Sequence, residues 1–383
     1  MKIAIEAQRI FRKKKHGMDI VALELIRHLQ QIDRVNEYFI FVKQDEDNKV
    51  LEETDNFHII EMPAVPYPVW EQHYLPRAIA KLAPDILHCT SNTAPVKVNV
   101  PVVLTLHDIL YMDKIDLTKG SWYQRLGNLY RRWIVSRIIH QCEKIVTVSG
   151  FEKEQIDQHF SLPAGRVKTV YNALSTSFRQ ISDPAGVEVY RKKYHLPEQY
   201  VLYLGNTHPN KNMRNVLKAM SLLHHQHKNP LPLVMPDTDK KFLDKILQEI
   251  NDPGLEAHIH LTGYIPNHEL VYVYNMASLF LYPSFYESFG IPMLEAMACG
   301  IPVIASDRTG MPEVAGGAAS LINPEDAAEI ASAMQRLLTD DDLYAQYKNA
   351  GLRRAASFNW STTAQQMLEV YEEVYYQNSA VYA

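Results

Sequence analysis

Short apolar runs rich in β-branched residues alternate along the chain with stretches whose apolar positions recur at helical spacing. In the first half the runs are KIAIEA, YFIFVK, HIIEM, DILHCT, VPVVLTLHD, KIVTVS and VKTVYN. The stretch DIVALELIRHLQQI carries apolar Leu23, Ile26 and Leu29, which would share one helix face. This alternation of strand and helix patterns predicts an α/β domain with a mainly parallel sheet.

The same alternation resumes near residue 200 with YVLYLGN, LPLVM, HIHLTGY, SLFLYPS and VIASD, each followed by a helix-patterned stretch. Residues 174–199, between the two series, are polar, contain proline and show no clear strand, so we place a linker there. The last segment, WSTTAQQMLEVYEEVYYQ, offers Ser361 as an N-cap and predicts a closing helix. Two doubly wound domains in tandem would place the carboxyl ends of both sheets beside an inter-domain crevice, where such sheets bind ligands.

The length of 383 residues also suits two domains. We assign residues 1–185 to a first Rossmann-like domain, 186–365 to a second, and 366–383 to the closing helix. No apolar run reaches the roughly 20 residues of a membrane-spanning helix. The N-terminus lacks a basic leader with an apolar core, so no signal peptide is expected and the cytoplasm is the expected compartment.

Charge and cysteine usage exclude several classes of protein. The net charge of −5 combines a first half near +2 with a second half near −7, which argues against a general nucleic-acid binder. The three cysteines, Cys89, Cys142 and Cys299, are widely spaced and form no CxxC pair. They indicate buried thiols rather than a disulfide framework or a zinc site, and no His/Asp cluster of ligand spacing predicts another metal.

The segment ESFGIPMLEAMACG places two glutamates, Glu287 and Glu295, on either side of a turn. Continuous helix would separate them by about 12 Å, which suits poorly the carboxylates of a glycoside hydrolase, roughly 5 to 9.5 Å apart. Pro292 favours a helix start, so the amides of residues 289–291 would precede a helix N-terminus and could bind an anion or sugar hydroxyls. Two separated carboxylates beside these amides fit a long polar ligand.

The segment YPSFYESFGIPMLEAMACGIPVIASDRTGMPEV resembles the signature of the retaining glycosyltransferases of family 4, which have a two-domain GT-B fold and an E-x7-E motif at this place. The resemblance implies that the first domain binds the acceptor, that the second binds a nucleotide sugar, and that the closing helix packs back on the first. It also implies a donor-sugar site at Glu287, Phe289, Gly290 and Ile291, with Glu295 binding the nucleotide ribose.

Other family landmarks extend the implied donor site. YVLYLGNTHPNKNMRNVLKAM resembles the loop in which a lysine, here Lys211, holds the donor diphosphate. Asn206 and Asn210 stand where many relatives carry cations, so Asn206 is an uncharged candidate donor contact and Arg214 and His208 are candidate helpers. LTGYIPNHEL resembles the loop that meets the nucleobase, which makes Gly263 and Tyr264 candidates.

In the first domain, KKKHGMDIVALELI resembles the glycine loop that approaches the donor phosphates, with Gly17 as its glycine. VVLTLHDILY resembles the strand end that carries the active-site histidine, here His107. The segment KGSWYQRLGNLYRRWIVSRII, residues 119–139, gathers basic and aromatic residues. In relatives with lipid-linked acceptors such a surface contacts anionic membrane, so peripheral contact with the inner face of the cell membrane is one expectation; a packed helix with solvated arginines is the other.

These features predict transfer of a hexose from a nucleotide-diphosphate sugar to a glycan or lipid-linked hydroxyl, with retention, in bacterial surface-polysaccharide synthesis. The catalytic residues would be His107, Lys211 and Glu287, and neither a metal nor a cofactor is expected. A sugar-nucleotide epimerase of the same architecture and a catalytically inactive nucleotide-sugar-binding subunit remain as alternatives. A dehydrogenase is disfavoured because GNTHPN lacks GxGxxG. The sequence does not identify the nucleobase, sugar, acceptor or oligomeric state.

Overall fold

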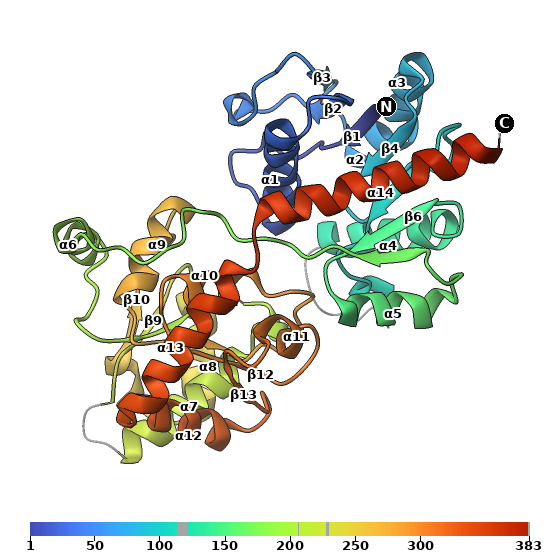
Figure 1. The fold of residues 1–383 in the computed structure, drawn as a ribbon. Helices are drawn as coiled ribbons and strands as arrows, with labels where there is room; N and C mark the ends of the chain where they lie inside the picture. Colours follow the sequence, from blue (N-terminus) through green and yellow to red (C-terminus); the bar gives the residue numbers. More distant parts are fainter. Residues whose placement is uncertain (113–121, 206, 227–229, 382–383) are drawn as a thin grey trace. The chain divides into compact units, whose positions relative to one another are not determined.

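The computed structural model describes residues 1–112, 122–205, 207–226 and 230–381 (Figure 1). The chain forms two compact units, which are described separately. Unit 1 comprises Met1–Asn172 and Trp360–Ala383, and unit 2 comprises Ala173–Asn359. The predicted division lay at residues 185 and 186, and the predicted closing helix began at residue 366.

Unit 1 contains a parallel sheet with the strand order β3-β2-β1-β4-β5-β6-β7. Its strands are β1 (Lys2–Glu6), β2 (Glu37–Lys43), β3 (Phe57–Met62), β4 (Ile86–Cys89), β5 (Val102–Thr105), β6 (Lys144–Thr147) and β7 (Val167–Thr169). Ile3 of β1 pairs with Tyr38 on one side and Ile86 on the other. The interior strands are buried on both faces, which explains why the sequence shows continuous apolar runs there.

The helices of unit 1 cover this sheet. They are α1 (Gly17–Ile32), α2 (Tyr67–Val69), α3 (Leu75–Leu82), α4 (Trp122–Ile138), α5 (Gly150–Phe160) and α14 (Trp360–Val381), with the short helices η1 (Asn48–Val50), η2 (Trp70–Tyr74) and η3 (Leu110–Met112). α1 begins after His16, whose backbone N–H donates to the Asp19 carboxylate at 3.0 Å. It buries Leu23, Ile26 and Leu29, the face that the sequence pattern predicted.

The C-terminal helix α14 packs on unit 1, against α1 and β4 (Figure 1), which confirms the predicted return of this helix to the first domain. Its Tyr371 hydroxyl lies 2.7 Å from Nδ1 of His88 in β4. Glu373 pairs with Lys144 of β6. The last helix of the chain is therefore part of the core of the first unit.

Unit 2 contains a second parallel sheet, with the order β10-β9-β8-β11-β12-β13. Its strands are β8 (Val201–Tyr203), β9 (Leu233–Met235), β10 (Ile259–Leu261), β11 (Leu279–Tyr282), β12 (Val303–Ser306) and β13 (Ser320–Ile322). The sequence analysis had not anticipated β13. Two doubly wound parallel sheets confirm the predicted fold class.

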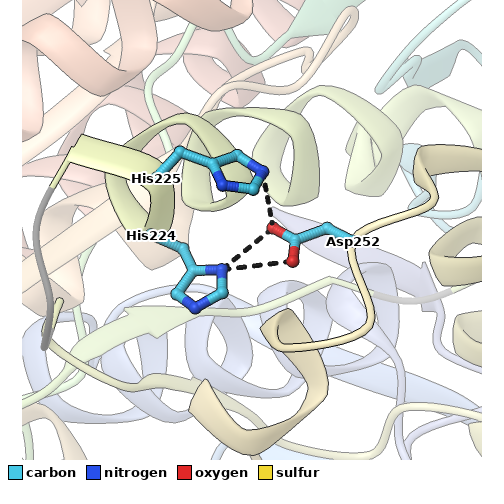
Figure 2. A group of neighbouring side chains, drawn as sticks. All are labelled: His224, His225 and Asp252. Carbon is cyan, nitrogen blue, oxygen red and sulfur yellow. Dashed lines mark hydrogen bonds and ion pairs between the residues drawn. The ribbon is translucent and has the colours of Figure 1, made fainter.

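The helices of unit 2 are α6 (Pro184–Lys193), α7 (Met213–Gln226), α8 (Lys240–Ile250), α9 (Asn267–Met276), α10 (Ile291–Ala298), α11 (Met311–Ala315), α12 (Ala327–Thr339) and α13 (Asp341–Ala356), with η4 (Pro209–Lys211) and η5 (Leu255–His258). The end of α7 packs near the segment after α8, where Asp252 contacts His224 and His225 (Figure 2). The two ends of unit 2 lie side by side, because Leu174 N–H donates to the Phe358 carbonyl at 3.2 Å. No helix in the described parts of the chain is both long and apolar enough to cross a bilayer.

Candidate functional site

The strand order of unit 2 reverses between β8 and β11, since the chain runs outward through β9 and β10 and then returns to add β11, β12 and β13 on the other side. Open parallel sheets bind ligands beyond the carboxyl ends of their strands at such a reversal. The loop after β8 carries Lys211, the loop after β11 carries Glu287, and the loop after β12 carries Thr309. The topology therefore explains why residues up to 98 positions apart meet at this edge.

Lys211 and Glu287 form an ion pair in which Nζ lies 2.6 Å from Oε1. Both side chains are largely shielded, with 23% and 17% exposed. The Tyr203 hydroxyl donates to the Lys211 carbonyl at 2.7 Å, and Nζ lies 5.2 Å from the centre of the Tyr282 ring. The structure thus brings together two of the predicted site residues, and an ammonium with three donors can hold a carboxylate and a phosphate oxygen together.

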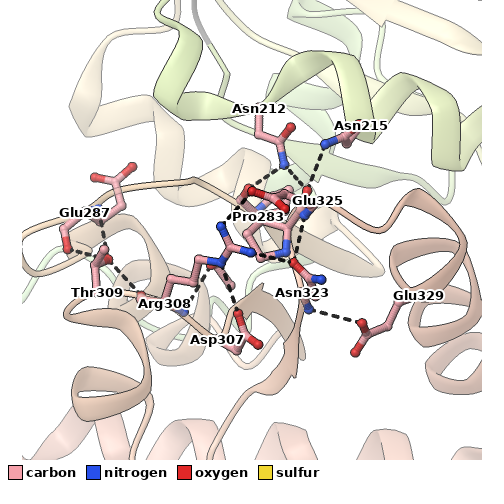
Figure 3. A network of polar contacts seen from close by, with 12 residues as sticks. Asn212, Asn215, Pro283, Glu287, Asp307, Arg308, Thr309, Asn323, Glu325 and Glu329 are labelled. Carbon is pink, nitrogen blue, oxygen red and sulfur yellow. Dashed lines mark hydrogen bonds and ion pairs between the residues drawn. The ribbon is translucent and has the colours of Figure 1, made fainter.

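Asn212, directly after Lys211, fixes the position of this loop. Its Nδ2 donates to the Pro283 carbonyl at 2.9 Å and to the Pro324 carbonyl at 2.6 Å (Figure 3). Its φ of 65° is in the left-handed region, which asparagine tolerates better than most residues. The sequence analysis did not select Asn212, although an Asn after a short turn is a recognisable signal for this conformation.

Thr309 holds the backbone of Glu287. The Glu287 N–H donates to Thr309 Oγ1 at 3.2 Å, and Oγ1 lies 3.1 Å from the Glu287 carbonyl oxygen (Figure 3). The Gly310 N–H donates to the same carbonyl at 3.2 Å. Sequence reasoning missed Thr309, because a β-branched residue gives no signal that it will adopt its φ of 59°.

Gly290 forms the turn between Glu287 and α10. Its φ of 95° is one that only glycine adopts easily. It precedes Ile291 at the start of α10, where the first amides of a helix have no partner within the helix and the helix dipole favours a negative or oxygen-rich ligand. The neighbouring Phe289 is 3% exposed and packs edge-on against Phe358. Gly290 and Ile291 thus lie where predicted, while the Phe289 ring serves the core.

Glu295 lies one turn into α10 and is only 8% exposed. The Tyr274 hydroxyl donates to its Oε2 at 3.0 Å. Burial raises the pKa of Glu295 to about 7, and the Tyr274 hydrogen bond opposes this shift. The carboxyl group therefore keeps its proton to a higher pH than an exposed glutamate does, and in the protonated form it can both donate and accept hydrogen bonds.

The remaining predicted donor contacts of unit 2 are less closely grouped. The Gly263 carbonyl accepts the Asp237 N–H at 2.9 Å, which joins the loops after β9 and β10, and Tyr264 is 56% exposed. Asn206 lies outside the described residues. Of the candidate helpers, Arg214 pairs with Glu249, and His208 has a pKa lowered by burial and by the charge of Lys211.

Unit 1 contains the other predicted site residues. Gly17 begins α1, and a Cβ at this position would meet nothing within 4 Å. His107 follows β5, where its N–H donates to Asn92 Oδ1 at 2.7 Å and its Nε2 lies 3.1 Å from the Thr90 carbonyl oxygen. Burial lowers the pKa of His107, so its ring is neutral at pH 7, with Nε2–H as the donor to that carbonyl. Nδ1 is then an acceptor.

A buried carboxylate pair in unit 1 was also missed. Glu6 ends β1 and Glu71 lies in η2, and neither is exposed. The hydroxyls of Tyr67 and Thr93 hydrogen-bond to Glu71. Burial and the Glu71 charge raise the pKa of Glu6 to about 7. Glu6 ends an otherwise apolar run, a signal that could have drawn attention to it.

Comparison with known proteins gives consistent matches to both halves of the chain. The family model "Glycosyl transferases group 1" matches residues 187–354, and "Glycosyltransferase Family 4" matches residues 16–178. The O-antigen chain mannosyltransferase B of Escherichia coli is 36% identical over 272 residues, which are 70% of each chain. The serotype-specific mannosyltransferase WbdA of Escherichia coli is 30% identical over 76% of this chain, but only 37% of its own length is matched.

The fold agrees with these matches. The structure of HepE from Anabaena in complex with UDP superimposes with a TM-score of 0.73 at 18% identity, covering 97% of this chain and all of that one. Family models match both halves of the chain, which forms two doubly wound sheets with a lysine and a glutamate paired at the reversal of the second sheet. The chain therefore belongs to the glycosyltransferases of family 4, group 1, and has the GT-B fold.

Proposed function

We propose that this glycosyltransferase moves a hexose from a nucleotide-diphosphate sugar to a hydroxyl of a glycan or lipid-linked acceptor, with retention at the anomeric carbon. The observation that carries the proposal is the Lys211–Glu287 pair at the strand reversal of unit 2. A cation and a carboxylate 2.6 Å apart suit the junction of a donor, where the charged diphosphate joins the polyhydroxyl sugar.

In this proposal each loop of unit 2 contacts one part of the donor. Lys211 and the amides at the start of α10 stabilise the leaving diphosphate, and Glu287 accepts hydrogen bonds from the sugar. Glu295 binds the ribose hydroxyls, and Gly263 with Tyr264 contacts the nucleobase. Asn206 is an additional donor contact. These roles follow the resemblance to family 4, and the loops after β10, β8 and β11, which carry Gly263, Lys211 and Glu287, lie in this order along the sheet.

The chemistry we propose is a front-face displacement. The bond from the anomeric carbon to the phosphate oxygen breaks, the acceptor hydroxyl attacks from the same face, and the leaving phosphate takes the hydroxyl proton. Lys211 stabilises the charge that develops on the diphosphate, so no metal is required. Gly17 and neutral His107 are the proposed substrate contacts of unit 1.

The names of the relatives support a more specific proposal for the transferred sugar and for the acceptor. Two of them carry names of mannosyltransferases, and one of these is an O-antigen chain enzyme. We therefore propose mannose as the transferred hexose and a bacterial surface polysaccharide as the product. The structure of HepE was solved with UDP, but that protein is only 18% identical to this chain. The nucleotide is therefore to be identified by experiment.

The first test is a thermal-shift panel with UDP, GDP, ADP and dTDP, because a ligand that binds only the native state raises the apparent stability. One nucleotide should raise the melting temperature of the wild type, and Lys211→Ala should abolish this rise. Lys240→Ala, an exposed lysine of α8 paired with Asp244, is the matched control and should keep it. The absence of a shift with all four nucleotides would contradict the proposed donor site.

Turnover separates the proposal from its alternatives. Nucleotide-sugar donor incubated with a mannose-containing acceptor should give an elongated glycan with the anomeric configuration of the donor, also in the presence of EDTA. An epimerase would instead convert the donor without an acceptor. A binding subunit would show the nucleotide-dependent thermal shift with no product.

Peripheral membrane contact is a further part of the proposal. Leu126, Leu129 and Trp133 of α4 are 60%, 46% and 49% exposed and, at spacings of three and four, form one apolar stripe. Arg132 and Arg137 lie on the same helix, which favours an anionic lipid surface. Sedimentation with anionic vesicles should capture the wild type and the control Val189→Glu on α6, but not Leu129→Glu. Equal capture of Leu129→Glu would exclude this surface.

A further inference from the structure

A group of two imidazoles and one carboxylate lies at the end of α7, away from the proposed donor residues. His224 and His225 are in the last turn of α7, and Asp252 follows α8, so two segments of unit 2 meet here (Figure 2). One ligand atom from each of the three residues lies within 4.8 Å of the others. α7 begins just after Lys211 and has 14 residues, which places this group about 20 Å along the helix from Lys211.

The spacing of the atoms matches that of ligands around one ion. His224 Nδ1 lies 3.0 Å from Asp252 Oδ2, and His225 Nε2 lies 3.5 Å from the same oxygen. Two atoms bound to a tetrahedral zinc ion at about 2.0 to 2.1 Å are themselves about 3.3 Å apart. Figure 2 shows both rings directed toward the carboxylate.

Neighbouring groups hold the carboxylate and one ring in place. Ser221 Oγ donates to Asp252 Oδ2 at 2.7 Å, and the Gly254 N–H donates to Oδ1 at 3.3 Å. The His258 ring lies 5.1 Å from the His224 ring, centre to centre. A Cβ at Gly254 would lie 2.5 Å from Cε1 of His224, so the absence of a side chain at Gly254 leaves room for the ring. Outer hydrogen bonds of this kind orient metal ligands.

The surroundings also suit a cation that arrives from solvent. The Asp252 side chain is 3% exposed, whereas the His225 side chain is 69% exposed and leaves an open approach. The C-terminal end of a helix carries partial negative charge, which favours a cation there. Two imidazole nitrogens with one carboxylate form a ligand set that binds zinc and its late first-row neighbours in preference to magnesium or calcium.

We propose that His224, His225 and Asp252 form a binding site for a borderline transition-metal ion such as Zn²⁺, with water completing the coordination. The ion would join the end of α7 to the segment after α8 and stabilise unit 2. It lies far from the proposed diphosphate contact, so this site is independent of the glycosyl transfer. The sequence analysis expected no metal because 27 positions separate His225 from Asp252 and only the fold brings them together.

The test replaces Zn²⁺ with Co²⁺, whose visible absorption reports the coordination geometry. Purified protein freed of metal should bind one equivalent of Co²⁺ with a visible band, and Zn²⁺ should displace it and raise the melting temperature. Loss of a group that only hydrogen-bonds to a metal ligand already weakens metal binding about 10- to 100-fold. His225→Ala and Asp252→Asn should therefore weaken binding by at least about tenfold.

The control is His268→Ala, another exposed histidine of unit 2, which should bind Co²⁺ as the wild type does. His225→Ala removes an exposed side chain, so its circular dichroism without metal should equal that of the wild type. The proposal is overturned if the wild type binds no stoichiometric Co²⁺, or if His225→Ala binds it equally well. Nucleotide shifts and turnover of His225→Ala should remain those of the wild type, which keeps this test separate from that of the proposed function.

Discussion

At the scale of single residues, Thr309 combines an unfavourable backbone with a favourable contact. Its φ of 59° costs a β-branched residue of the order of 1–3 kcal/mol. In return, one hydroxyl contacts both the N–H and the carbonyl of Glu287. Backbone strain of this kind persists where the surrounding structure requires it, and here it fixes the carboxylate assigned to the donor sugar.

Replacing this hydroxyl should therefore impair donor use more than folding. Thr309→Val keeps the branched shape but leaves the Glu287 amide without its partner, and should lower kcat/KM for the donor by about tenfold, the equivalent of roughly 1.4 kcal/mol. Thr309→Ser keeps the hydroxyl and should stay near the wild type. Steady-state kinetics with varied donor concentration would check this, and equal rates for the Ser and Val variants would contradict it.

Glu295 gives a prediction for the pH dependence of stability. Burial raises its pKa to about 7 from an ordinary value of 4.5. Between pH 4.5 and pH 7 the unfolded chain releases a proton from this carboxyl group that the folded chain keeps. The contribution of Glu295 to the free energy of unfolding therefore falls as pH rises through this range, and the whole loss of stability is present above pH 7. Glu295→Gln has no proton to release and should gain melting temperature over the wild type between pH 5 and pH 8.

The control is Glu325→Gln, since hydrogen bonding to Arg308 lowers the pKa of Glu325. This variant should show no such gain between pH 5 and pH 8. A constant difference between Glu295→Gln and the wild type across this range would mean that the folded and unfolded pKa values of Glu295 are equal.

Part of the site could be predicted from residue patterns and part could not. The resemblance to family 4 implied that Lys211 and Glu287 share one donor site, and the order of the strands explains their proximity. The positive φ of Thr309 and the burial of Glu295 depend on contacts between loops that have no periodicity in the sequence. The contact between His224 and Asp252 could not be predicted either, because it depends on the packing of α7 against the segment after α8.

At the scale of elements, α14 supplies polar contacts to the interior of unit 1. His88 lies in a fully buried strand, and burial lowers its pKa to about 3, so the ring is neutral at pH 7. Its Nδ1 contacts the Tyr371 hydroxyl and its Nε2 contacts Thr105 Oγ1, each at 2.7 Å. A neutral ring with both nitrogens partnered can be buried at low cost.

Tyr371→Phe removes one of these partners without changing the shape of the core. A buried polar atom left unpaired costs about 1–3 kcal/mol, so the free energy of unfolding should fall by this amount in urea titrations. Tyr376→Phe, at an exposed position of the same helix, should be neutral. If Tyr371→Phe were equally neutral, the contact with His88 would not contribute to stability.

The same scale shows where strand prediction failed. Longer runs such as VPVVLTLHD identified their strands, since buried parallel strands are continuously apolar. β13 has only three residues, Ser320–Ile322, and its middle residue Leu321 is 37% exposed. β8 and β9 are equally short but stand in the apolar runs YVLYLGN and LPLVM, whereas only Leu321 and Ile322 are large apolar residues in GGAASLIN. This segment therefore gives no strand signal by itself, and it forms a strand by pairing with β12.

At the scale of the whole molecule, unit 2 is inserted between two parts of unit 1. Its core draws only on Ala173–Asn359, so a fragment of these residues should fold and keep the nucleotide-dependent thermal shift. A fragment of residues 1–172 lacks α14 and should be unstable until residues 360–383 are supplied. Circular dichroism and thermal shifts of the fragments would check this, and a stable fragment 1–172 would contradict the role given to α14.

The pairing of Leu174 with Asn359 has a consequence for synthesis on the ribosome. α14 follows unit 2 along the chain, so the first 172 residues leave the ribosome before the helix that completes their core. Unit 2 can fold before them, and its adjacent ends then shorten the loop that α14 must close from 187 residues to a few, which lowers the entropy cost of closure. Unit 2 should therefore reach its native state first, although residues 1–172 leave the ribosome earlier. Its folding would bring α14 close to the residues of unit 1 that this helix packs against.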